Sequence, residues 1–272
     1  MAVFESVHQS LAQPTSAPRA LILAAGRGER MRPLTDATPK PLLPVRGKPM
    51  IEWQLLALAA AGVREVVINT AWLEEQFPAA LGDGSRWGLR IRYSHEGRRW
   101  GGALETGGGV ATALEALALG DKEPFWLLSG DIFMPGFVFE ASVVREFAQS
   151  ADLGLLWMVP NPPFNPRGDF CWGADQRLYR PVAKGQTADL RRADPSEPVA
   201  PSAGPDSQQA MTYASLALLK PAMVEGLEPG RRASLVPYLF KAADEGRLAG
   251  RVWNGPWQNV GTPEQWQALQ EA

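Results

Sequence analysis

Cysteine and histidine are scarce in this sequence, and each scarcity excludes a class of site. Cys171 is the single cysteine, so no disulfide can form within the chain. The two histidines, His8 and His95, stand apart from it and from each other, so no group of residues has the spacing of a zinc site. A lone cysteine is typical of proteins from reducing compartments, and we expect this protein to be cytoplasmic.

An excess of charge and a long apolar run are also missing. The formal net charge is −2, so no overall electric field draws the protein toward nucleic acid or anionic membranes. No apolar run approaches the roughly 18 to 20 residues that a membrane-spanning helix needs. Residues 1–18 lack the apolar segment of a signal peptide. We therefore expect a flexible tail at 1–18, a single domain at 19–272, and neither a nucleic-acid nor a membrane partner.

The most informative stretch begins with a short apolar run at residues 21–25. Gly26 and Gly28 follow it, and three arginines and a lysine come next, with few acidic residues between them. Glycine lets the backbone approach a phosphate and turn its N–H groups toward it, and guanidinium groups bind phosphate oxygens in pairs. The stretch therefore predicts a polyphosphate site in which Arg30 and Lys40 are candidate ligands.

Two other interpretations of this stretch stay open. A dinucleotide-binding turn requires a third glycine three residues after Gly28, and Met31 occupies that position. A tight surface turn with solvated arginines is the simpler alternative, because runs of charge usually lie in solvent. Lys40 has a simple alternative too, as an exposed loop lysine, although the prolines on both sides of it stiffen the loop.

Strand-like and helix-like segments alternate along the chain. This order is typical of a mostly parallel sheet with helices on both faces, which is a Rossmann-like α/β fold. Ligands collect at the carboxyl ends of the strands in such sheets. Asp131 follows one of these ends, where it is either a helix N-cap or a Mg²⁺ ligand. We expect helices at 50–61, 72–81, 107–119, 234–244 and from Pro263 onward, and strands at 63–69, 89–94, 125–128, 153–159, 211–219 and 247–253.

The second half of the chain is less regular than the first. Residues 170–182 predict two short antiparallel strands in a small, irregular lobe. Residues 193–208 are rich in Pro, Ser and Asp, which indicates a surface loop. Residues 96–102 are basic and rich in glycine, which indicates either a solvated hairpin tip or a mobile flap over the site.

Four motifs, at residues 23–42, 104–109, 129–131 and 257–262, resemble those of the sugar-1-phosphate nucleotidyltransferases and occur in the same order. The resemblance implies a glycosyltransferase-A-like fold. It also implies a reaction in which a sugar 1-phosphate attacks the α-phosphorus of a nucleoside triphosphate and releases pyrophosphate. Such a transfer needs positioning and charge neutralisation, and no covalent nucleophile from the protein.

The substrates follow from the same resemblance. The amino-acid sequences of residues 30–35, 104–109 and 167–170 resemble those of uridylyltransferases that act on N-acetylmuramate 1-phosphate in cell-wall recycling. Mannose or glucose 1-phosphate with GTP or UTP is the alternative. The nucleotide-binding part is expected at about 19–135, and the sugar-binding and C-terminal part at about 136–272. We expect a monomer or a small homo-oligomer.

The resemblance also implies roles for individual residues. Arg30 would neutralise charge on the moving and leaving phosphates, and Lys40 would bridge the sugar phosphate and the α-phosphate. Asp169 has an alternative as a solvated turn aspartate. The implied nucleotide-binding residues are Ala24, Ala25, Gly26, Gly28, Glu105, Gly107 and Gly108, the sugar-binding residues are Thr106, Gly168 and Asp169, and the ligands of Mg²⁺, or of Mn²⁺ in its place, are Asp131 and Asn259.

Two positions depart from the family pattern. Asn259 stands where the family usually has aspartate, and its carbonyl oxygen can ligate Mg²⁺ but supplies no charge. We expect a weaker metal site that depends more on the phosphates, and the alternative is a regulatory protein that binds nucleotide with little turnover. Ser215 lies in a segment where relatives more often carry glycine, which leaves the identity of the sugar open.

Overall fold

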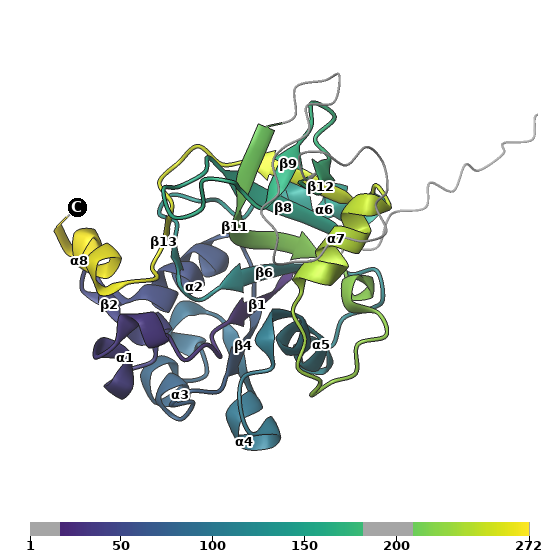
Figure 1. Ribbon diagram of the computed structural model, residues 1–272. Coiled ribbons are helices and arrows are strands. Elements are labelled where there is room, and N and C mark those ends of the chain that lie inside the picture. The colour runs from purple at the N-terminus through teal and green to yellow at the C-terminus, as the bar shows by residue number, and fades with distance from the viewer. Residues whose placement is uncertain (1–16, 182–208, 272) are drawn as a thin grey trace, which may run out of the picture.

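The computed structural model describes residues 17–181 and 209–271 (Figure 1). Nine strands join in one sheet that extends through both halves of the chain, with helices on both of its faces. The Rossmann-like α/β fold that the sequence predicts is confirmed. The expected surface loop at 193–208, and most of the expected N-terminal tail, lie outside the described residues.

Four parallel strands form the first half of the sheet. Their order in space is β5 (Arg90–His95), β4 (Glu65–Thr70), β1 (Arg19–Leu23) and β6 (Phe125–Ser129). The middle strands are mainly apolar and almost fully buried, which is the composition of parallel strands that helices cover on both faces. Because the four strands run in one direction, the residues that follow them meet at a single edge of the sheet.

The second half of the sheet is mostly antiparallel. β11 (Gln209–Leu219) pairs antiparallel with β6 on one side and with β8 (Gly154–Val159) on the other. β12 (Leu248–Val252) adds to β8 in parallel. The first residues of β11 pair with β9 (Phe170–Trp172), which in turn pairs antiparallel with β10 (Leu178–Tyr179). The two short antiparallel strands that the sequence predicts are therefore confirmed.

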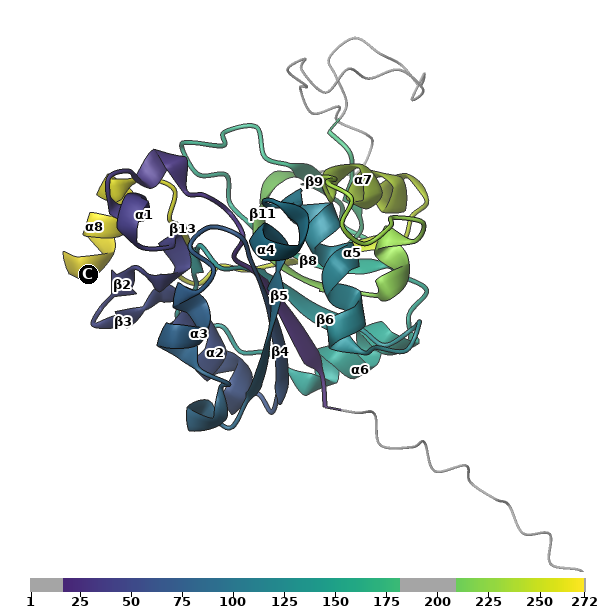
Figure 2. The ribbon, with the colours of Figure 1, turned by 90° about the horizontal axis from the view of Figure 1, so that it is seen from below.

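Each face of the sheet has its own apolar core, because side chains alternate along the strands. In β1, Ile22 belongs to one core and Leu21 to the other. The helices that pack on the two cores are α2 (Met50–Ala60), α3 (Gln76–Leu81), α5 (Glu105–Leu117), α6 (Ala141–Gln149) and α7 (Val236–Asp244). Figure 2 shows α2 and α3 on one side of the parallel strands and α5 and α7 on the other. No described helix is both long and apolar enough to cross a membrane.

Some elements differ from the sequence predictions. Residues 96–102, predicted as a hairpin tip or flap, contain the short helix α4 (Glu96–Trp100), whose first side chain is buried. The predicted helix at 72–81 is shorter, because Leu73 adopts a positive φ of 47° within a turn and the helix begins at Gln76. The remaining short helices are α1 (Leu34–Ala37) and the 3₁₀ turns Glu29–Met31, Lys40–Leu42, Ser85–Trp87 and Pro221–Val224.

The C-terminal segment returns to the N-terminal part of the chain. β13 (Gln258–Asn259) pairs antiparallel with β7 (Ile132–Phe133). The following helix, α8 (Pro263–Glu271), lies beside the small hairpin of β2 (Pro44–Val45) and β3 (Lys48–Pro49) (Figure 1). Proline at the first position of α8 agrees with the sequence prediction. The segment brings residues 257–262 next to the end of the sheet where β1 and β6 finish.

The backbone conformation at Ser215 is one that glycine adopts more easily than serine. It lies in an irregularity of β11 and has a φ of 59°, a left-handed conformation that costs a residue with a side chain roughly 1 to 2 kcal/mol. We expect Ser215→Gly to raise the free energy of unfolding by about 0.5 to 1 kcal/mol, measured by urea denaturation. Ser142→Gly in the helix α6 is the control and should lower it. An unchanged midpoint for Ser215→Gly would contradict the assigned strain.

Candidate active site

A cavity of about 290 Å³, cavity A, opens at the carboxyl ends of β1, β4 and β6. The last residues of β1 and β6, and the penultimate residue of β4, all line it. This is the edge at which open α/β sheets bind ligands. The lining residues are Leu23, Ala24, Ala25, Gly26, Gly28, Lys40, Pro41, Asn69, Ala103, Glu105, Thr106, Ser129, Asp131 and Arg232. Eight of the residues expected to act on the nucleotide, the sugar, the sugar phosphate or the metal therefore line one cavity.

The glycine-rich loop after β1 is held by a buried threonine. Thr35 donates its hydroxyl hydrogen to the carbonyl oxygen of Gly28 at 2.8 Å, and its methyl group lies 3.0 Å from where a Cβ on Gly28 would be. Gly28 also has a φ of 67°, so only glycine takes this position without strain. Gly26 is exposed and has open space around it. The loop thus leaves its backbone accessible to a ligand in cavity A.

The structure gives the three arginines of this loop different surroundings. Arg27 stacks on Trp72, with its guanidinium carbon 3.3 Å from the ring centre, and its Nη2 lies 3.4 Å from a carboxylate oxygen of Asp36. Arg32 pairs with the same carboxylate at 3.2 Å. Arg30 forms no ion pair with any described residue, and its guanidinium lies beside Gly261 in the C-terminal segment. Arg30 does not line cavity A, but it is the arginine whose charge is available.

Lys40 and Asp131 meet in cavity A although 91 positions separate them in the sequence. The ammonium nitrogen of Lys40 lies 2.5 Å from Oδ2 of Asp131. The hydroxyl of Ser129 donates to Oδ1 of the same carboxylate at 2.6 Å. The lysine is 13% exposed and the aspartate 21%, so solvent screens the pair only in part. A cation and an anion are thus held together at the carboxyl ends of β1 and β6.

The turn that carries Asp131 is fixed from three sides. The side-chain amide of Gln54 in α2 donates to the carbonyl oxygens of Ser129 and Ile132, at 2.9 and 3.0 Å. The N–H of Gly130 donates to the end of β1 at 2.8 Å, and the N–H of Val260 donates to the carbonyl oxygen of Asp131 at 2.9 Å. Gln54 was not predicted from the sequence, because its burial, which requires a hydrogen-bond partner for the amide, is visible only in the structure.

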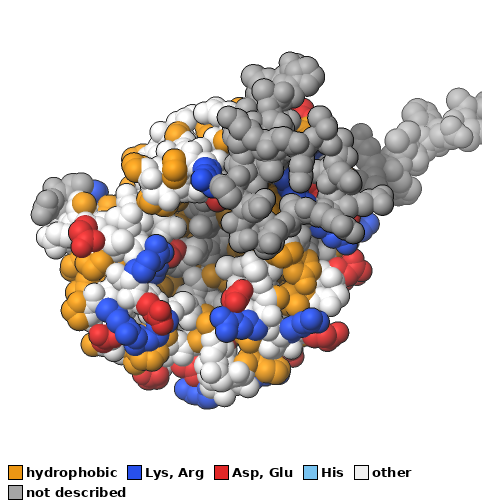
Figure 3. All heavy atoms as spheres, viewed as in Figure 1, with side chains coloured by type: hydrophobic (Ala, Val, Ile, Leu, Met, Phe, Trp, Pro, Cys, Tyr) orange, Lys and Arg blue, Asp and Glu red, His pale blue; other side chains and the backbone are white. Residues whose placement is uncertain are grey.

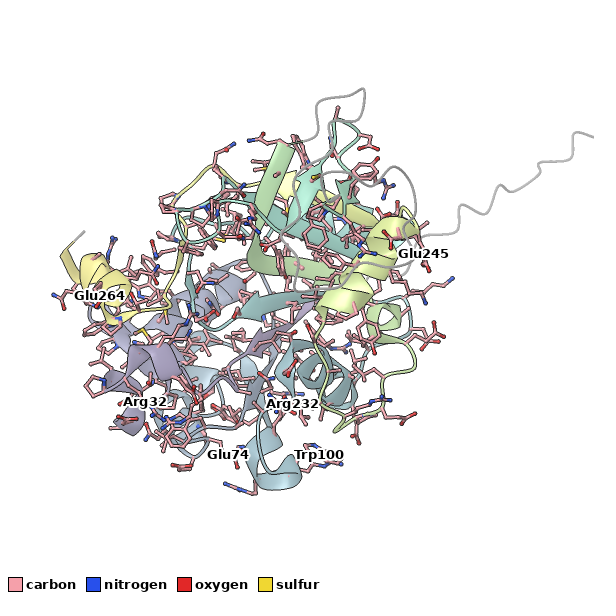
Figure 4. All side chains as sticks on the ribbon, viewed as in Figure 1. Arg32, Glu74, Trp100, Arg232, Glu245 and Glu264 are labelled. Carbon is pink, nitrogen blue, oxygen red and sulfur yellow. The ribbon has the colours of Figure 1, made fainter. Side chains whose placement is uncertain are left out.

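The start of α5 forms a second wall of cavity A. Glu105 has a φ of 61° and pairs with Arg232 at 3.0 Å, and both residues line the cavity. Figure 4 labels Arg232 in the region where α5 begins. Thr106 also lines the cavity, and its hydroxyl oxygen accepts the N–H of Leu235 at 2.9 Å. The sequence analysis missed Arg232, because nothing distinguishes it there from an ordinary loop arginine.

Gly107 and Gly108 are not among the residues that line cavity A. A Cβ on Gly107 would lie 2.7 Å from the carbonyl oxygen of Ser234, and the N–H of Gly108 donates to the carbonyl oxygen of Ala233 at 2.9 Å. The two glycines therefore let the first turn of α5 pack directly on the backbone of residues 231–234. The structure gives them this packing role and does not bring them to the cavity.

A second cavity, cavity B, has a volume of about 610 Å³ and receives the other expected sugar-site residues. Asp169 uses both carboxylate oxygens inside the protein, accepting from the amide of Asn165 at 3.0 Å and from the N–H of Tyr213 at 2.9 Å. Burial, together with Asp169, raises the pKa of the Tyr213 phenol above its usual value, so the phenol stays protonated. The lining includes Phe164, Arg167, Gly168, Asp169, Phe170, Tyr213, Ser215, Phe240, Trp257 and Asn259.

The two expected metal ligands line different cavities and are connected by the pairing of β7 with β13. Asp131 lines cavity A and directly precedes β7, whereas Asn259 lines cavity B and belongs to β13, the partner of β7. No group of three acidic, histidine or cysteine residues gathers within the described parts of the chain. One carboxylate and one amide oxygen fit Mg²⁺, because this ion keeps several waters and binds substrate phosphates.

Charge on the surface agrees with a local site. In Figure 3, Lys and Arg side chains lie among Asp and Glu side chains on the face shown, and no single sign covers it. The face shown therefore has no broad field of one sign.

Comparison with known proteins identifies the class. Residues 19–166 match the family model described as nucleotidyl transferase. The chain therefore belongs to the nucleotidyl transferase family, and it is an enzyme of the sugar-1-phosphate nucleotidyltransferase class.

Its relatives include enzymes with several substrates. The chain is 40% identical to the N-acetylmuramate alpha-1-phosphate uridylyltransferase of Neisseria meningitidis, over 90% of this chain and 93% of that protein. It is 31% identical to the enzyme of the same name from Caulobacter vibrioides, over 92% and 95%. It is also 44% identical to the mannose-1-phosphate guanylyltransferase of Mycobacterium tuberculosis, but over only 61% of that protein.

Among solved structures, a Bacillus anthracis protein assigned as a glucose-1-phosphate thymidylyltransferase has the same fold. Its TM-score is 0.68 at 20% identity, and the match covers 94% of each chain. At this identity the likeness concerns the fold alone.

Proposed function

We propose that this enzyme transfers a uridylyl group from UTP to N-acetylmuramate 1-phosphate, which forms a UDP-sugar and pyrophosphate in cell-wall recycling. The observation that carries the proposal is the similarity to two uridylyltransferases of that name over at least nine tenths of both chains. The geometry supports the reaction class, because Lys40 and Asp131 meet at the mouth of a glycine-rich loop. UTP fits cavity A and the sugar fits cavity B in this proposal.

In the proposed mechanism, the protein positions the two substrates and neutralises the charge on their phosphates. The N–H groups of residues 25–28 bind the triphosphate, and the ammonium of Lys40 holds the attacking sugar phosphate against the α-phosphate. A phosphate oxygen that binds Lys40 competes with Asp131 for the ammonium group, so the pair at 2.5 Å opens when substrates enter. Arg30 then neutralises the charge that accumulates on the leaving pyrophosphate.

Asp131 and Asn259 would hold Mg²⁺ in the proposed complex, and Mn²⁺ can take its place. The bound ion neutralises phosphate charge and orients the triphosphate. Of the two, Asp131 would supply the charged ligand, and most of the remaining ligands would come from water and phosphate. The hydroxyl of Ser129 keeps the carboxylate in one orientation.

The sugar is proposed to lie in cavity B. Five aromatic side chains line it, and sugars commonly lie on such apolar faces while polar groups bind their hydroxyls. The neutral phenol of Tyr213 is a hydrogen-bond donor there. Gly168 and Asp169 shape the wall by holding β11, since a Cβ on Gly168 would lie 2.7 Å from the carbonyl oxygen of Met211.

One other substrate pair requires a direct test. The observation that supports this alternative, GTP with mannose 1-phosphate, is the 44% identity to a mannose-1-phosphate guanylyltransferase. A panel of UTP, GTP and dTTP against the 1-phosphates of N-acetylmuramate, mannose and glucose, read as pyrophosphate release, separates the candidates. The proposal expects UTP with N-acetylmuramate 1-phosphate to have the highest kcat/KM by at least tenfold. A higher value for any other pair overturns it. Size-exclusion chromatography of the same sample tests for a monomer or small homo-oligomer.

Asn259 keeps a third candidate, a nucleotide-binding regulatory protein, in consideration. We expect Asn259→Asp to lower the Mg²⁺ concentration for half-maximal activity by about tenfold, because it adds a charged oxygen ligand. Asn254→Asp adds the same charge at an exposed position that lines neither cavity, so it is the control and should leave the Mg²⁺ dependence unchanged. No pyrophosphate release by the wild type with Mg²⁺ or Mn²⁺ would favour the regulatory protein.

A further inference from the structure

Glu96 is a charged residue that is buried without a basic partner. It begins α4, and its relative exposure is 0%. No lysine, arginine or histidine among residues 17–181 and 209–271 forms an ion pair with it. The neighbouring charges pair elsewhere: Arg98 and His95 both lie against Glu74, at 3.2 and 3.7 Å. A buried charge in this state requires hydrogen bonds to compensate its lost hydration.

Those hydrogen bonds form a chain between the two walls of cavity A. The N–H of Ala24 donates to Oδ1 of Asn69 at 2.7 Å, and the Asn69 amide donates to Oε1 of Glu96 at 2.7 Å. The other carboxylate oxygen, Oε2, accepts the N–H of Leu104 at 2.8 Å. Ala24 begins the glycine-rich loop, and Leu104 lies between Ala103 and Glu105 of the opposite wall. Two side chains thus connect the two walls.

The direction of every hydrogen bond in this chain is fixed. Both ends are backbone N–H groups, so the side chains between them must present an acceptor at each end. Asn69 turns its oxygen to Ala24 and its amide to Glu96, and Glu96 must then accept from both sides. A carboxylate meets this requirement, whereas a glutamine would place an N–H group against another N–H group.

Gly109 shows that the helix α5 leaves space for this pair. A Cβ on Gly109 would lie 2.5 Å from the amide nitrogen of Asn69 and 3.0 Å from Oε1 of Glu96. Desolvation by burial raises the pKa of Glu96, and the hydrogen bonds from Leu104 and Asn69 only partly oppose this effect. The fold thus retains a buried carboxylate at a site where burial disfavours its charge.

We propose that Asn69 and Glu96 are positioning residues that set the distance between the two walls of cavity A and thereby hold the loop at 24–28 in its nucleotide-binding shape. The inference rests on the proposed binding of a nucleoside triphosphate in this cavity. It follows that damage to the pair weakens the binding of the triphosphate and leaves the binding of the sugar phosphate nearly unchanged.

The first test replaces the carboxylate alone. We expect Glu96→Gln to weaken UTP binding, measured by equilibrium dialysis with Mg²⁺, by about tenfold, as the loss of one hydrogen bond and the gain of one repulsion predict. Glu74→Gln is the matched control, because Glu74 is also buried beside α4 (Figure 4), whereas the hydrogen bonds from Asn69 and Leu104 go to Glu96. It should bind UTP within twofold of the wild type. Unchanged UTP affinity in Glu96→Gln overturns the proposal.

The second test exchanges the amide and the carboxylate between the two positions. In Asn69→Asp, two carboxylates face each other, and the variant should bind UTP more weakly than the wild type. In the double variant Asn69→Asp with Glu96→Gln, the introduced aspartate would accept from Ala24 and from the glutamine amide, while the glutamine oxygen would accept from Leu104. All three hydrogen bonds re-form, so we expect UTP affinity within threefold of the wild type. A double variant that folds but has the summed losses of the single variants overturns the proposal.

Two further measurements separate this inference from the proposed function. Hydrogen exchange at the amides of Ala24 and Leu104 should accelerate at least tenfold in Glu96→Gln and return to the wild-type rate in the exchanged variant. This result needs no catalytic turnover. In active enzyme, Glu96→Gln should raise KM for UTP about tenfold and change KM for the sugar phosphate less than twofold. Equal increases in both KM values, or unchanged exchange, overturn the inference, whereas an inactive wild type contradicts only the proposed function.

Discussion

The Lys40→Ala variant is expected to lose activity by a factor of about 10² to 10³ in kcat, the range found when a single preorganised charge-stabilising group is removed. Lys40 is the less exposed of the two cationic residues that line cavity A, at 13% against 72% for Arg232. Pro39 and Pro41 are both buried and restrict the backbone on either side of it. The ammonium group is therefore held in place before substrates arrive, and little ordering entropy is lost during the reaction.

The same variant should affect stability much less than activity. Removal of the lysine ammonium leaves Asp131 with the hydroxyl of Ser129 as a hydrogen-bond donor and with 21% of its side chain exposed to solvent. Measuring both the midpoint of thermal unfolding and the rate of pyrophosphate release for this variant separates the two effects. Lys48→Ala is the control, because Lys48 lies in the nearby β3, with its ammonium group over the ring of Trp53. A kcat for Lys40→Ala within tenfold of the wild type would mean that Lys40 is an ordinary loop lysine.

The sequence predicted the parts of the fold that depend on local patterns. The apolar runs gave β1, β4 and β6, and their carboxyl ends gave the edge where the site lies. Local chemistry also marked Lys40 between two prolines and Asp131 after a strand. The structure adds that these two residues meet, which no local pattern could state, because their contact depends on the packing of β1 beside β6.

The missed features depend on contacts between distant segments. The glycines of residues 96–102 predict a loop. The structure has a short helix there, whose first residue, Glu96, is held by buried hydrogen bonds from Asn69 and Leu104. Gln54 acts on a turn more than 70 positions away. Gly107 and Gly108 were assigned to the nucleotide, whereas their neighbours in the structure are the backbone atoms of residues 231–234. Burial of a polar group was the common signal, and it becomes visible only in three dimensions.

The second large effect concerns Arg30. Arg27 and Arg32 already share Asp36, and Arg27 also stacks on Trp72, so their charges are partly neutralised. Arg30 is exposed, and its long side chain rests beside Gly261 without an acidic partner among the described residues. A guanidinium group in this state can turn toward a phosphate without breaking an existing ion pair. The structure thus separates one available arginine from two whose charges are paired with Asp36.

We expect Arg30→Ala to lower kcat by about 100-fold, because charge on the leaving pyrophosphate then lacks its guanidinium partner. Arg32→Ala removes an equal charge from the same loop and should change kcat less than threefold. The reverse reaction sharpens the assignment. If Arg30 binds the leaving group, Arg30→Ala raises KM for pyrophosphate about tenfold while KM for the UDP-sugar stays close to its wild-type value. Equal effects of Arg30→Ala and Arg32→Ala would mean that the loop contributes only general positive charge. An unchanged kcat in Arg30→Ala would mean that the loop is only a tight surface turn.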